Sequence, residues 1–179
     1  MLFNTIEFGI FFIVVYCLYL VLNHQWQNRM LLLTSCFFYG YWDWRFLLLL
    51  FFSIIVDYFC ALEIEGSENP IRRKKFLIFS ISSNLLVLGF FKYFNFFASS
   101  LESVVRPLGW QLDSVTLNII LPVGISFYTF QAMSYTIDVY RREIKATHRF
   151  LDFALYVTYF PQLVAGPIER AKHLFCPRF

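Results

Sequence analysis

Long apolar runs separated by short polar segments dominate this sequence. The first extends from Ile6 to Leu22, and a second from Met30 to Leu62 with one polar and aromatic interruption, Tyr41 to Arg45. As one helix rising about 1.5 Å per residue, the second run would be about 50 Å long, too long for one crossing of a hydrocarbon layer about 30 Å thick. The pattern therefore predicts two short helices that meet at the interruption.

The next apolar runs, Phe76–Phe91 and Ile119–Ile137, are each interpreted as a further crossing. Between them, Tyr93–Val105 is aromatic at its start and polar at its end, which predicts a separate amphipathic helix at the membrane surface. Residues 106–118 contain Pro107 and Gly109 and are predicted to form a loop.

The last apolar run, Phe150–Val164, cannot continue as a regular helix. It contains Pro161 and is followed by Gly166 and Pro167. Irregular backbone at membrane depth is tolerated only against protein or a water-filled cavity. We therefore predict a helix that breaks inside the protein or at its rim.

The composition indicates that these apolar runs lie in lipid. Hydrophobic residues make up 59% of the 179-residue chain, aromatic residues 22% and charged residues only 15%, against about 25% charged residues in soluble domains. So much apolar surface needs lipid, and a soluble protein with a Phe-rich core is the alternative. The predicted fold class is an all-α polytopic membrane protein of about five to six short or broken transmembrane helices. Met1–Leu22 has no basic residue and is interpreted as a retained helix, not a signal peptide.

Charge predicts how the chain is oriented. The net charge is +3, and the densest basic clusters lie in two polar segments, residues 63–75 and 138–149. Basic loops stay in the cytoplasm, and two predicted crossings separate these two, so both are expected there with the N-terminus outside. A lipid-headgroup site in loop 63–75 is the alternative. No nucleic-acid partner is expected, because the basic residues form no continuous binding stripe.

Few side chains point to metal or disulfide chemistry. The four cysteines, Cys17, Cys36, Cys60 and Cys176, share no close spacing, so we expect neither a disulfide framework nor a metal site. Asp57 lies inside an apolar run and should face protein or water, since an ionisable group facing lipid costs about 2.5–3.5 kcal/mol. Both a structural contact and a place in a functional cavity fit it.

The segment Leu121–Arg142 carries more polar side chains than an anchor needs. Pro122 is expected in the first turn of its helix, and Gly124 and Ser126 would let another helix approach closely. Gln131 and Tyr135 would lie deeper in the same helix. Catalytic motifs are not found: His148 and Asp152 are interpreted as an ordinary polar pair at a helix start, and His173 has no accompanying nucleophile motif.

Two sequence blocks resemble the membrane-bound O-acyltransferase family, in its alginate O-acetyltransferase-like branch. They are GISFYTFQ with SYTIDVYR, within residues 124–141, and FPQLVAGPIER, residues 160–170. FKYFNFF at 91–97 with the preceding Phe90, and FYGYWDWRF at 38–46, also resemble that branch. The resemblance covers essentially the whole chain.

The resemblance implies that residues 1–179 are the N-terminal part of a single transmembrane domain of this family. The family's catalytic histidine lies in the later half, so no catalytic residue is assigned here, and the 179-residue chain alone is expected to be inactive. No bound cofactor is expected, whereas an activated acyl donor is implied. The implied partners are the lipid bilayer, a polysaccharide or other cell-envelope acceptor such as alginate, and accessory acyl-transfer proteins, at the bacterial inner membrane.

The same resemblance implies a substrate tunnel through the membrane. Its candidate wall residues in this chain are Asn84, Ser126, Gln131, Tyr135 and Arg170, supported by a structural motif of Pro122, Gly124, Pro161, Gly166 and Pro167. Two alternatives stay open: the polar residues only join helices to one another, or the chain is a non-enzymatic channel, transporter or assembly subunit.

Overall fold

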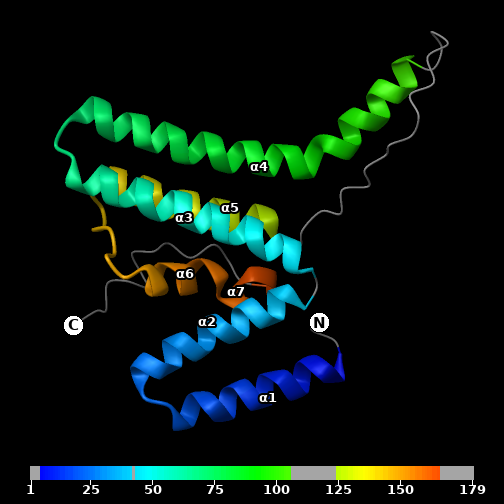
Figure 1. Ribbon diagram of the computed structural model, residues 1–179, viewed down its shortest axis with the longest axis vertical. Coiled ribbons are helices and arrows are strands. Elements are labelled where there is room, and N and C mark those ends of the chain that lie inside the picture. The colour runs from blue at the N-terminus through cyan, green and yellow to red at the C-terminus, as the bar shows by residue number, and fades with distance from the viewer. Residues whose placement is uncertain (1–4, 42, 106–123, 166–179) are drawn as a thin grey trace.

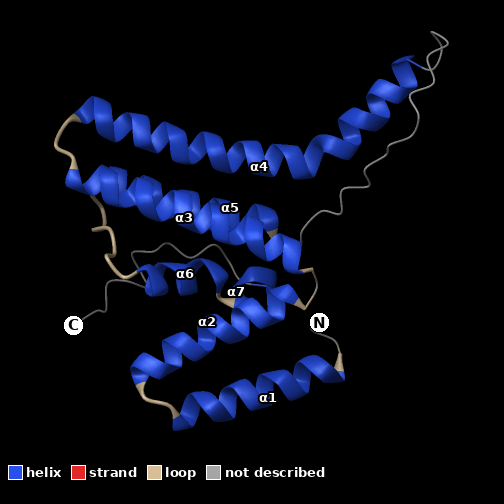
Figure 2. Cartoon of the chain, viewed as in Figure 1, coloured by secondary structure: helices blue, strands red, loops and turns tan. Residues whose placement is uncertain are grey.

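The computed structural model describes residues 5–41, 43–105 and 124–165, and every regular element within these ranges is a helix (Figures 1 and 2). The helices are α1 (Ile6–Val21), α2 (His24–Gly40), α3 (Trp44–Gly66), α4 (Pro70–Val105), α5 (Ile125–Tyr140), α6 (Phe150–Thr158) and α7 (Phe160–Ala165). The all-α prediction is confirmed. The predicted loop at 106–118 and Pro122 lie outside the described residues.

The predicted interruption of the second apolar run is confirmed. α2 ends at Gly40, and α3 begins at Trp44 with Asp43 as its N-cap, whose carboxylate accepts the Arg45 N–H at 2.9 Å. A short polar side chain that takes up a free N–H is what a helix start needs. Tyr41 and Trp44 beside this break are both exposed, as expected for aromatic residues at a membrane surface.

The polar segments contain less loop than the sequence pattern suggests. Residues 24–29 form the first turns of α2, not a loop, and Asn23 is the N-cap: its carbonyl accepts the N–H groups of Trp26 and Gln27 at 2.8 Å. Gln27 Nε2 also donates to the Tyr19 carbonyl near the end of α1, at 2.9 Å. Polar side chains here close helix ends, so polarity alone did not mark a loop.

In the hydrophilic segment 63–75, only residues 67–69, between α3 and α4, are not helical. Pro70 opens α4, where its missing N–H costs nothing, and Asn69 Oδ1 accepts the Ile71 N–H at 2.9 Å. The charged residues on either side continue the two helices.

The prediction of a separate surface helix at 93–105 is wrong. Its backbone is the last part of α4, a single 36-residue helix. Residues 93–105 contain no Pro or Gly, so nothing in the backbone chemistry stops a helix that has already formed. Figure 1 shows α4 bending, with its C-terminal part turned away from the other helices.

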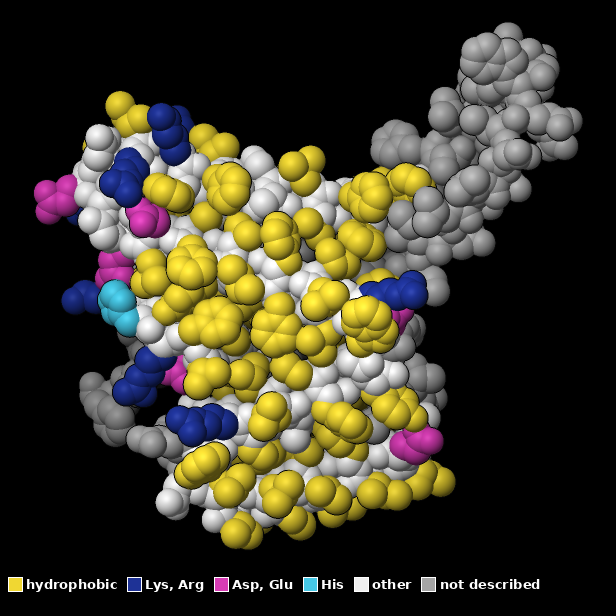
Figure 3. Space-filling model, viewed as in Figure 1, with side chains coloured by type: hydrophobic (Ala, Val, Ile, Leu, Met, Phe, Trp, Pro, Cys, Tyr) yellow, Lys and Arg dark blue, Asp and Glu magenta, His cyan; other side chains and the backbone are white. Residues whose placement is uncertain are grey.

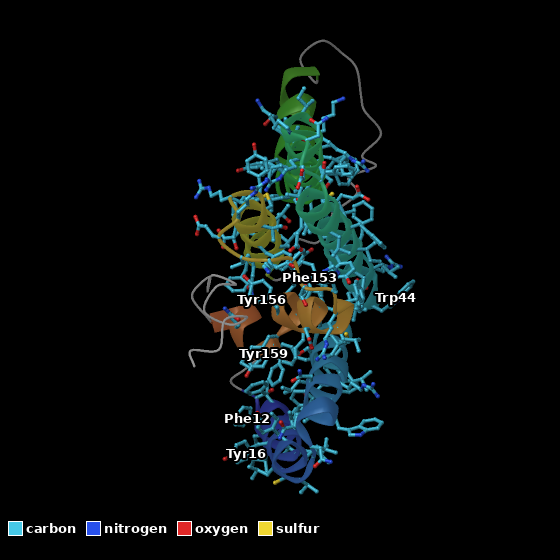
Figure 4. The ribbon with its side chains drawn as sticks, turned by 90° about the vertical axis from the view of Figure 1, so that its left-hand side faces the viewer. Phe12, Tyr16, Trp44, Phe153, Tyr156 and Tyr159 are labelled. Carbon is cyan, nitrogen blue, oxygen red and sulfur yellow. The ribbon has the colours of Figure 1, made fainter. Side chains whose placement is uncertain are left out.

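The helices stack in layers from α4 at the top of Figure 1 to α1 at the bottom. α3, α4 and α5 pack against one another, and α6 lies between them and α2. The main core includes Leu50 and Ile54 of α3, Tyr128 and Tyr135 of α5 and Phe153 of α6. Figure 4 shows Phe153 and Tyr156 in the middle of the bundle and Trp44 at its outer edge.

Two helices within the described ranges are long and apolar enough to cross a membrane, Trp44–Gly66 and residues Pro70–Phe94 of α4, and Ile6–Val21 is a shorter apolar helix. Figure 3 shows hydrophobic side chains spread over the middle of one face, with most Lys and Arg side chains gathered at one edge. Ile6, Leu33 and Leu86 are among the large hydrophobic residues that are exposed. The surface suits lipid.

The two basic segments lie at the same end of the bundle. Arg73 Nη2 donates to the Tyr140 carbonyl at 2.7 Å, and Glu65 Oε2 accepts the Ala146 N–H at 2.9 Å. α1 starts at the opposite end (Figure 1). This is the relative arrangement that counting crossings predicted.

Candidate functional site

Helix α5 is the most enclosed part of the candidate site. It begins after Gly124, whose φ of 78° is left-handed and suits a residue without Cβ. Ten of its sixteen residues are buried, including Gln131 and Tyr135, whereas Ser126 is half-buried in the first turn. Of the predicted site and motif residues, Pro122, Gly166, Pro167 and Arg170 lie outside the described residues.

Gln131 forms a hydrogen bond beside the predicted helix break. α6 ends at Thr158 and α7 begins at Phe160, so the break falls at Tyr159, two residues before Pro161. Gln131 Nε2 donates to the Tyr156 carbonyl at 2.7 Å. On the other side of the break, the Phe160 N–H donates to Ser35 Oγ at 3.3 Å.

These two bonds replace the helix hydrogen bond that is lost at the break. In a continuous helix the Phe160 N–H would bond to the Tyr156 carbonyl. Here each group bonds to a side chain from another helix, Ser35 of α2 and Gln131 of α5. Phe160 is 2% exposed and Tyr156 is also buried, whereas Tyr159 at the break is exposed. The predicted break is therefore confirmed, and it lies at the rim of the protein.

Tyr135 holds the segment that follows α5. Its hydroxyl accepts the Thr147 N–H at 2.8 Å, and its ring lies 4.5 Å from that of Phe153 between centroids. Tyr58 Oη donates to the His148 carbonyl at 2.8 Å. Together with the bond between Glu65 and Ala146, three consecutive residues of this loop are fixed by side chains from α3 and α5.

Several polar atoms on α5 are buried without a partner among the described residues. They are Tyr128 Oη, Thr129 Oγ1 and Gln131 Oε1. All three residues lie in the first two turns of the helix. Because a buried polar atom without a partner is costly, this end of α5 is suited to water or to a ligand hydroxyl.

Asn84 belongs to a different polar cluster. Its Nδ2 donates to both carboxylate oxygens of Asp57, at 2.9 and 2.8 Å, and to the Ser80 carbonyl at 3.0 Å. Ser80 Oγ also donates to the Asp57 carboxylate. Asp57 is 0% exposed, so the prediction that it faces protein is confirmed. The structure thus places Gln131 and Tyr135 against α6 but Asn84 against α3.

Arg73 contacts the end of α5, a role that the sequence analysis did not distinguish from that of the other basic residues in its cluster. It is buried, its Nη2 bonds to the carbonyls of Val139 at 3.5 Å and Tyr140 at 2.7 Å, and its guanidinium lies 5.5 Å from the Tyr140 ring centroid. It therefore closes the C-terminal end of α5, where a cation is favoured.

Asp152 and His148, the other polar residues considered above, are not arranged as a catalytic pair. Asp152 accepts from Asn28 Nδ2 at 3.5 Å, which joins α6 to α2, and His148 is exposed. Within the described ranges, no three His, Cys, Asp or Glu residues are grouped to hold a metal ion, and Cys17, Cys36 and Cys60 are free.

Comparison with known proteins points to one group of enzymes. The chain is 40% identical over 176 residues to a probable alginate O-acetylase of Pseudomonas aeruginosa and 35% identical over 178 residues to that of Pseudomonas putida, each match covering 97% of this chain. It is also 35% identical over 209 aligned residues to a peptidoglycan O-acetyltransferase of Helicobacter pylori, a match covering all of this chain. No family model and no solved structure matches it.

The matches have a consistent extent. They cover 34%, 36% and 38% of these three relatives, in their N-terminal part. The chain therefore spans about a third of the length of the curated relatives it matches.

Proposed function

Because this chain belongs to the membrane-bound O-acyltransferases of the alginate O-acetylase type, as the counterpart of their N-terminal third, we propose that it forms part of an enzyme that acetylates hydroxyl groups of an exported polysaccharide. The co-substrate is an activated acyl donor, and accessory acyl-transfer proteins are its partners. The acceptor class follows from the relatives, which are named for alginate and for peptidoglycan.

The observation that carries this proposal is the 40% identity that extends over 97% of the chain. Identity spread over seven helices and their connections indicates a shared architecture, not one shared motif. The Gln131 contact to the Tyr156 carbonyl adds local support, since it ties the first of the two resembling sequence blocks to α6, which directly precedes the second block.

In this proposal the first two turns of α5 form part of the wall along which the acceptor hydroxyl or water moves. Three observations support the placement: Tyr128 Oη, Thr129 Oγ1 and Gln131 Oε1 are buried without described partners. Ser126 lies half-buried one turn earlier. The roles of Asn84, Tyr135 and Arg170 as tunnel residues remain part of the proposal, with Tyr135 and Asn84 also holding helices together.

We further propose that the end of the bundle with loops 67–69 and 141–149 faces the cytoplasm of a bacterial inner membrane. Excess Lys and Arg at this end supports that orientation. Single cysteines at Glu68 and Glu143, in a cysteine-free background, should react with an impermeant thiol reagent only after the cells are opened. A cysteine at Tyr41 should react in intact cells, and the reverse pattern would overturn the orientation.

A chimera tests the activity. This chain would replace the matching N-terminal third of the Pseudomonas aeruginosa alginate O-acetylase, in a strain that lacks the native protein, and acetyl esters on the secreted alginate would be measured. We expect esters to return. The matched variants are Gln131→Leu and Ser134→Ala. Gln131→Leu is expected to lower ester content by about fivefold to a hundredfold if it costs the expected 1–3 kcal/mol at the site, and Ser134→Ala is expected to leave it unchanged.

The chimera also separates the two classes of function. A chimera that inserts stably into the membrane but restores no esters would contradict the acetyltransferase proposal and favour a channel, transporter or assembly subunit. Protein amounts in the membrane fraction distinguish that result from failed folding.

A further inference from the structure

A carboxylate that forms no ion pair with any of the described residues lies inside the membrane-spanning part of the bundle. Asp57 falls in the middle third of α3, one of the two helices long and apolar enough to cross a membrane, and it is 0% exposed. Its neighbours from α4 are Ser80 and Asn84, which are also buried.

The hydrogen bonds to Asp57 come from neutral groups. Asn84 Nδ2 lies 2.9 and 2.8 Å from its two carboxylate oxygens, and Ser80 Oγ donates to one of them. No Lys, Arg or His of the described residues forms an ion pair with it. Neutral donors orient a carboxylate but leave its charge uncompensated.

Charged groups on the surrounding helices are engaged elsewhere. Arg73 of α4 bonds to carbonyls at the end of α5, Asp138 of α5 lies in the last turn of that helix, and Asp152 of α6 bonds to Asn28 of α2. Arg29 of α2 lies over the exposed Trp26 ring. Cys60 follows Asp57 by three residues on α3 itself and is a neutral thiol neighbour, not a positive one.

This arrangement lacks one positive charge. An isolated carboxylate in a low-dielectric interior is so unfavourable that such groups are paired, neutralised by a proton or bound to a cation. A second acceptor is nearby: Asn84 Oδ1 is buried and has no partner among the described residues. Asn84 turns Nδ2 toward Asp57 here, so its Oδ1 would join the carboxylate and hydroxyl oxygens after a 180° rotation of the amide. The rotated cluster would offer carboxylate, hydroxyl and amide oxygens, a set of hard ligands suited to a small cation.

We propose that Asp57, Ser80 and Asn84 form an intramembrane site that binds one monovalent cation, a proton or Na⁺, between α3 and α4. The bound charge neutralises Asp57 and holds the two spans together. The site uses none of the α5 atoms placed along the acceptor path, and it shares with the proposed tunnel the candidate residue Asn84.

The test uses the full-length protein that carries this chain, reconstituted in lipid nanodiscs. Infrared spectra would be recorded across a pH series for the carbonyl stretch of a protonated carboxylic acid. In parallel, the thermal unfolding midpoint would be measured as Na⁺ replaces an organic cation at constant ionic strength. The variants are Asp57→Asn, which keeps the shape and removes the charge, Ser80→Ala, and Asp152→Asn as a matched control.

Each source of charge has its own signature. If a proton is bound, the carboxylic acid band is present in the wild type, shifts in Ser80→Ala and is lost in Asp57→Asn. If Na⁺ is bound, the wild-type midpoint rises by several degrees as Na⁺ increases, because a ligand of the folded state stabilises it, and Asp57→Asn loses the rise. Asp152→Asn should behave as the wild type in both measurements.

A wild-type protein with neither the acid band nor a Na⁺-dependent midpoint overturns the proposal. Because both wild-type measurements stand alone, a variant that fails to fold does not block this decision.

Discussion

Two adjacent arginines, Arg72 and Arg73, have opposite surroundings. Arg72 forms an ion pair with Glu63 at 2.8 Å, with both side chains largely exposed. Arg73 is buried and bonds to two carbonyls at the end of α5. A run of basic residues at one membrane surface thus contains one residue whose role is to join two helices.

We expect Arg73→Ala to destabilise the protein by about 1.5–3 kcal/mol, since it removes charged hydrogen bonds and leaves the Tyr140 carbonyl without its donor. Arg72→Ala should cost less than about 1 kcal/mol, because exposed ion pairs contribute little. Equilibrium unfolding in detergent micelles, followed by far-UV circular dichroism, measures both. Equal losses in the two variants would contradict the assigned role of Arg73.

The bond from Gln131 to the Tyr156 carbonyl gives a second residue-level prediction. In Gln131→Leu, that carbonyl loses its donor inside the protein, and we expect a loss of about 1–3 kcal/mol. Ser134→Ala is the control, because among the described residues Ser134 Oγ bonds to the Gln131 carbonyl of its own helix, at 2.8 Å, and to no other helix. The same unfolding measurement applies, and the idea fails if Ser134→Ala costs as much as Gln131→Leu.

The sequence pattern predicted which residues are buried better than it predicted their hydrogen-bond partners. Asp57 inside an apolar run was predicted to face protein or water, and it faces protein. Its bonds to Ser80 and Asn84 were not predicted, because these residues lie 23 and 27 positions further along the chain and only packing sets which face of α4 meets α3. Arg73 and Ser35 were missed for the same reason: each contacts a segment remote in sequence.

At the scale of elements, the apolar runs located the helices, but the polar segments overstated the loops. Asn23 and Asn69 stop or start helices within one residue, and the charged residues beside them remain helical. The two-helix interpretation of 30–62 succeeded because Asp43 supplies a local capping signal. No such signal separates 93–105 from the span before it, and α4 continues through both.

Helix α1 is attached mainly through aromatic contacts. The Phe11 ring centroid lies 6.1 Å from that of Phe38 and 5.5 Å from that of Phe160, whereas Phe12 stacks on Tyr16 of its own helix. These contacts join α1 to α2 and α7. Packing, not water exclusion, holds such helices together in lipid.

We expect Phe11→Ala to loosen α1 while Phe12→Ala does not. Truncating a fully buried Phe costs about 3–5 kcal/mol, and because Phe11 is half-buried we expect roughly half of that. Hydrogen exchange of the α1 backbone amides in micelles should become faster in Phe11→Ala alone. Faster exchange in both variants, or in neither, would contradict the assigned contacts.

For the whole molecule, the apolar surface predicts how the chain behaves in cells. Large hydrophobic side chains on α1, α3 and α4 are exposed, including Ile10, Phe59 and Phe79. We expect the chain to stay in the membrane pellet after an alkaline carbonate wash and to need detergent for release. Recovery in the soluble wash would contradict the interpretation of α3 and α4 as spans.

The loop after α5 has a consequence for how chain length varies among related proteins. Ala146, Thr147 and His148 are fixed in turn by Glu65, Tyr135 and Tyr58, so inserting or deleting one residue there would put all three bonds out of register. The Helicobacter pylori relative aligns over 209 positions with this 179-residue chain, so the alignment contains gaps. We expect those gaps to fall outside residues 146–148, and a gap within that segment would show that the three-point attachment is not shared.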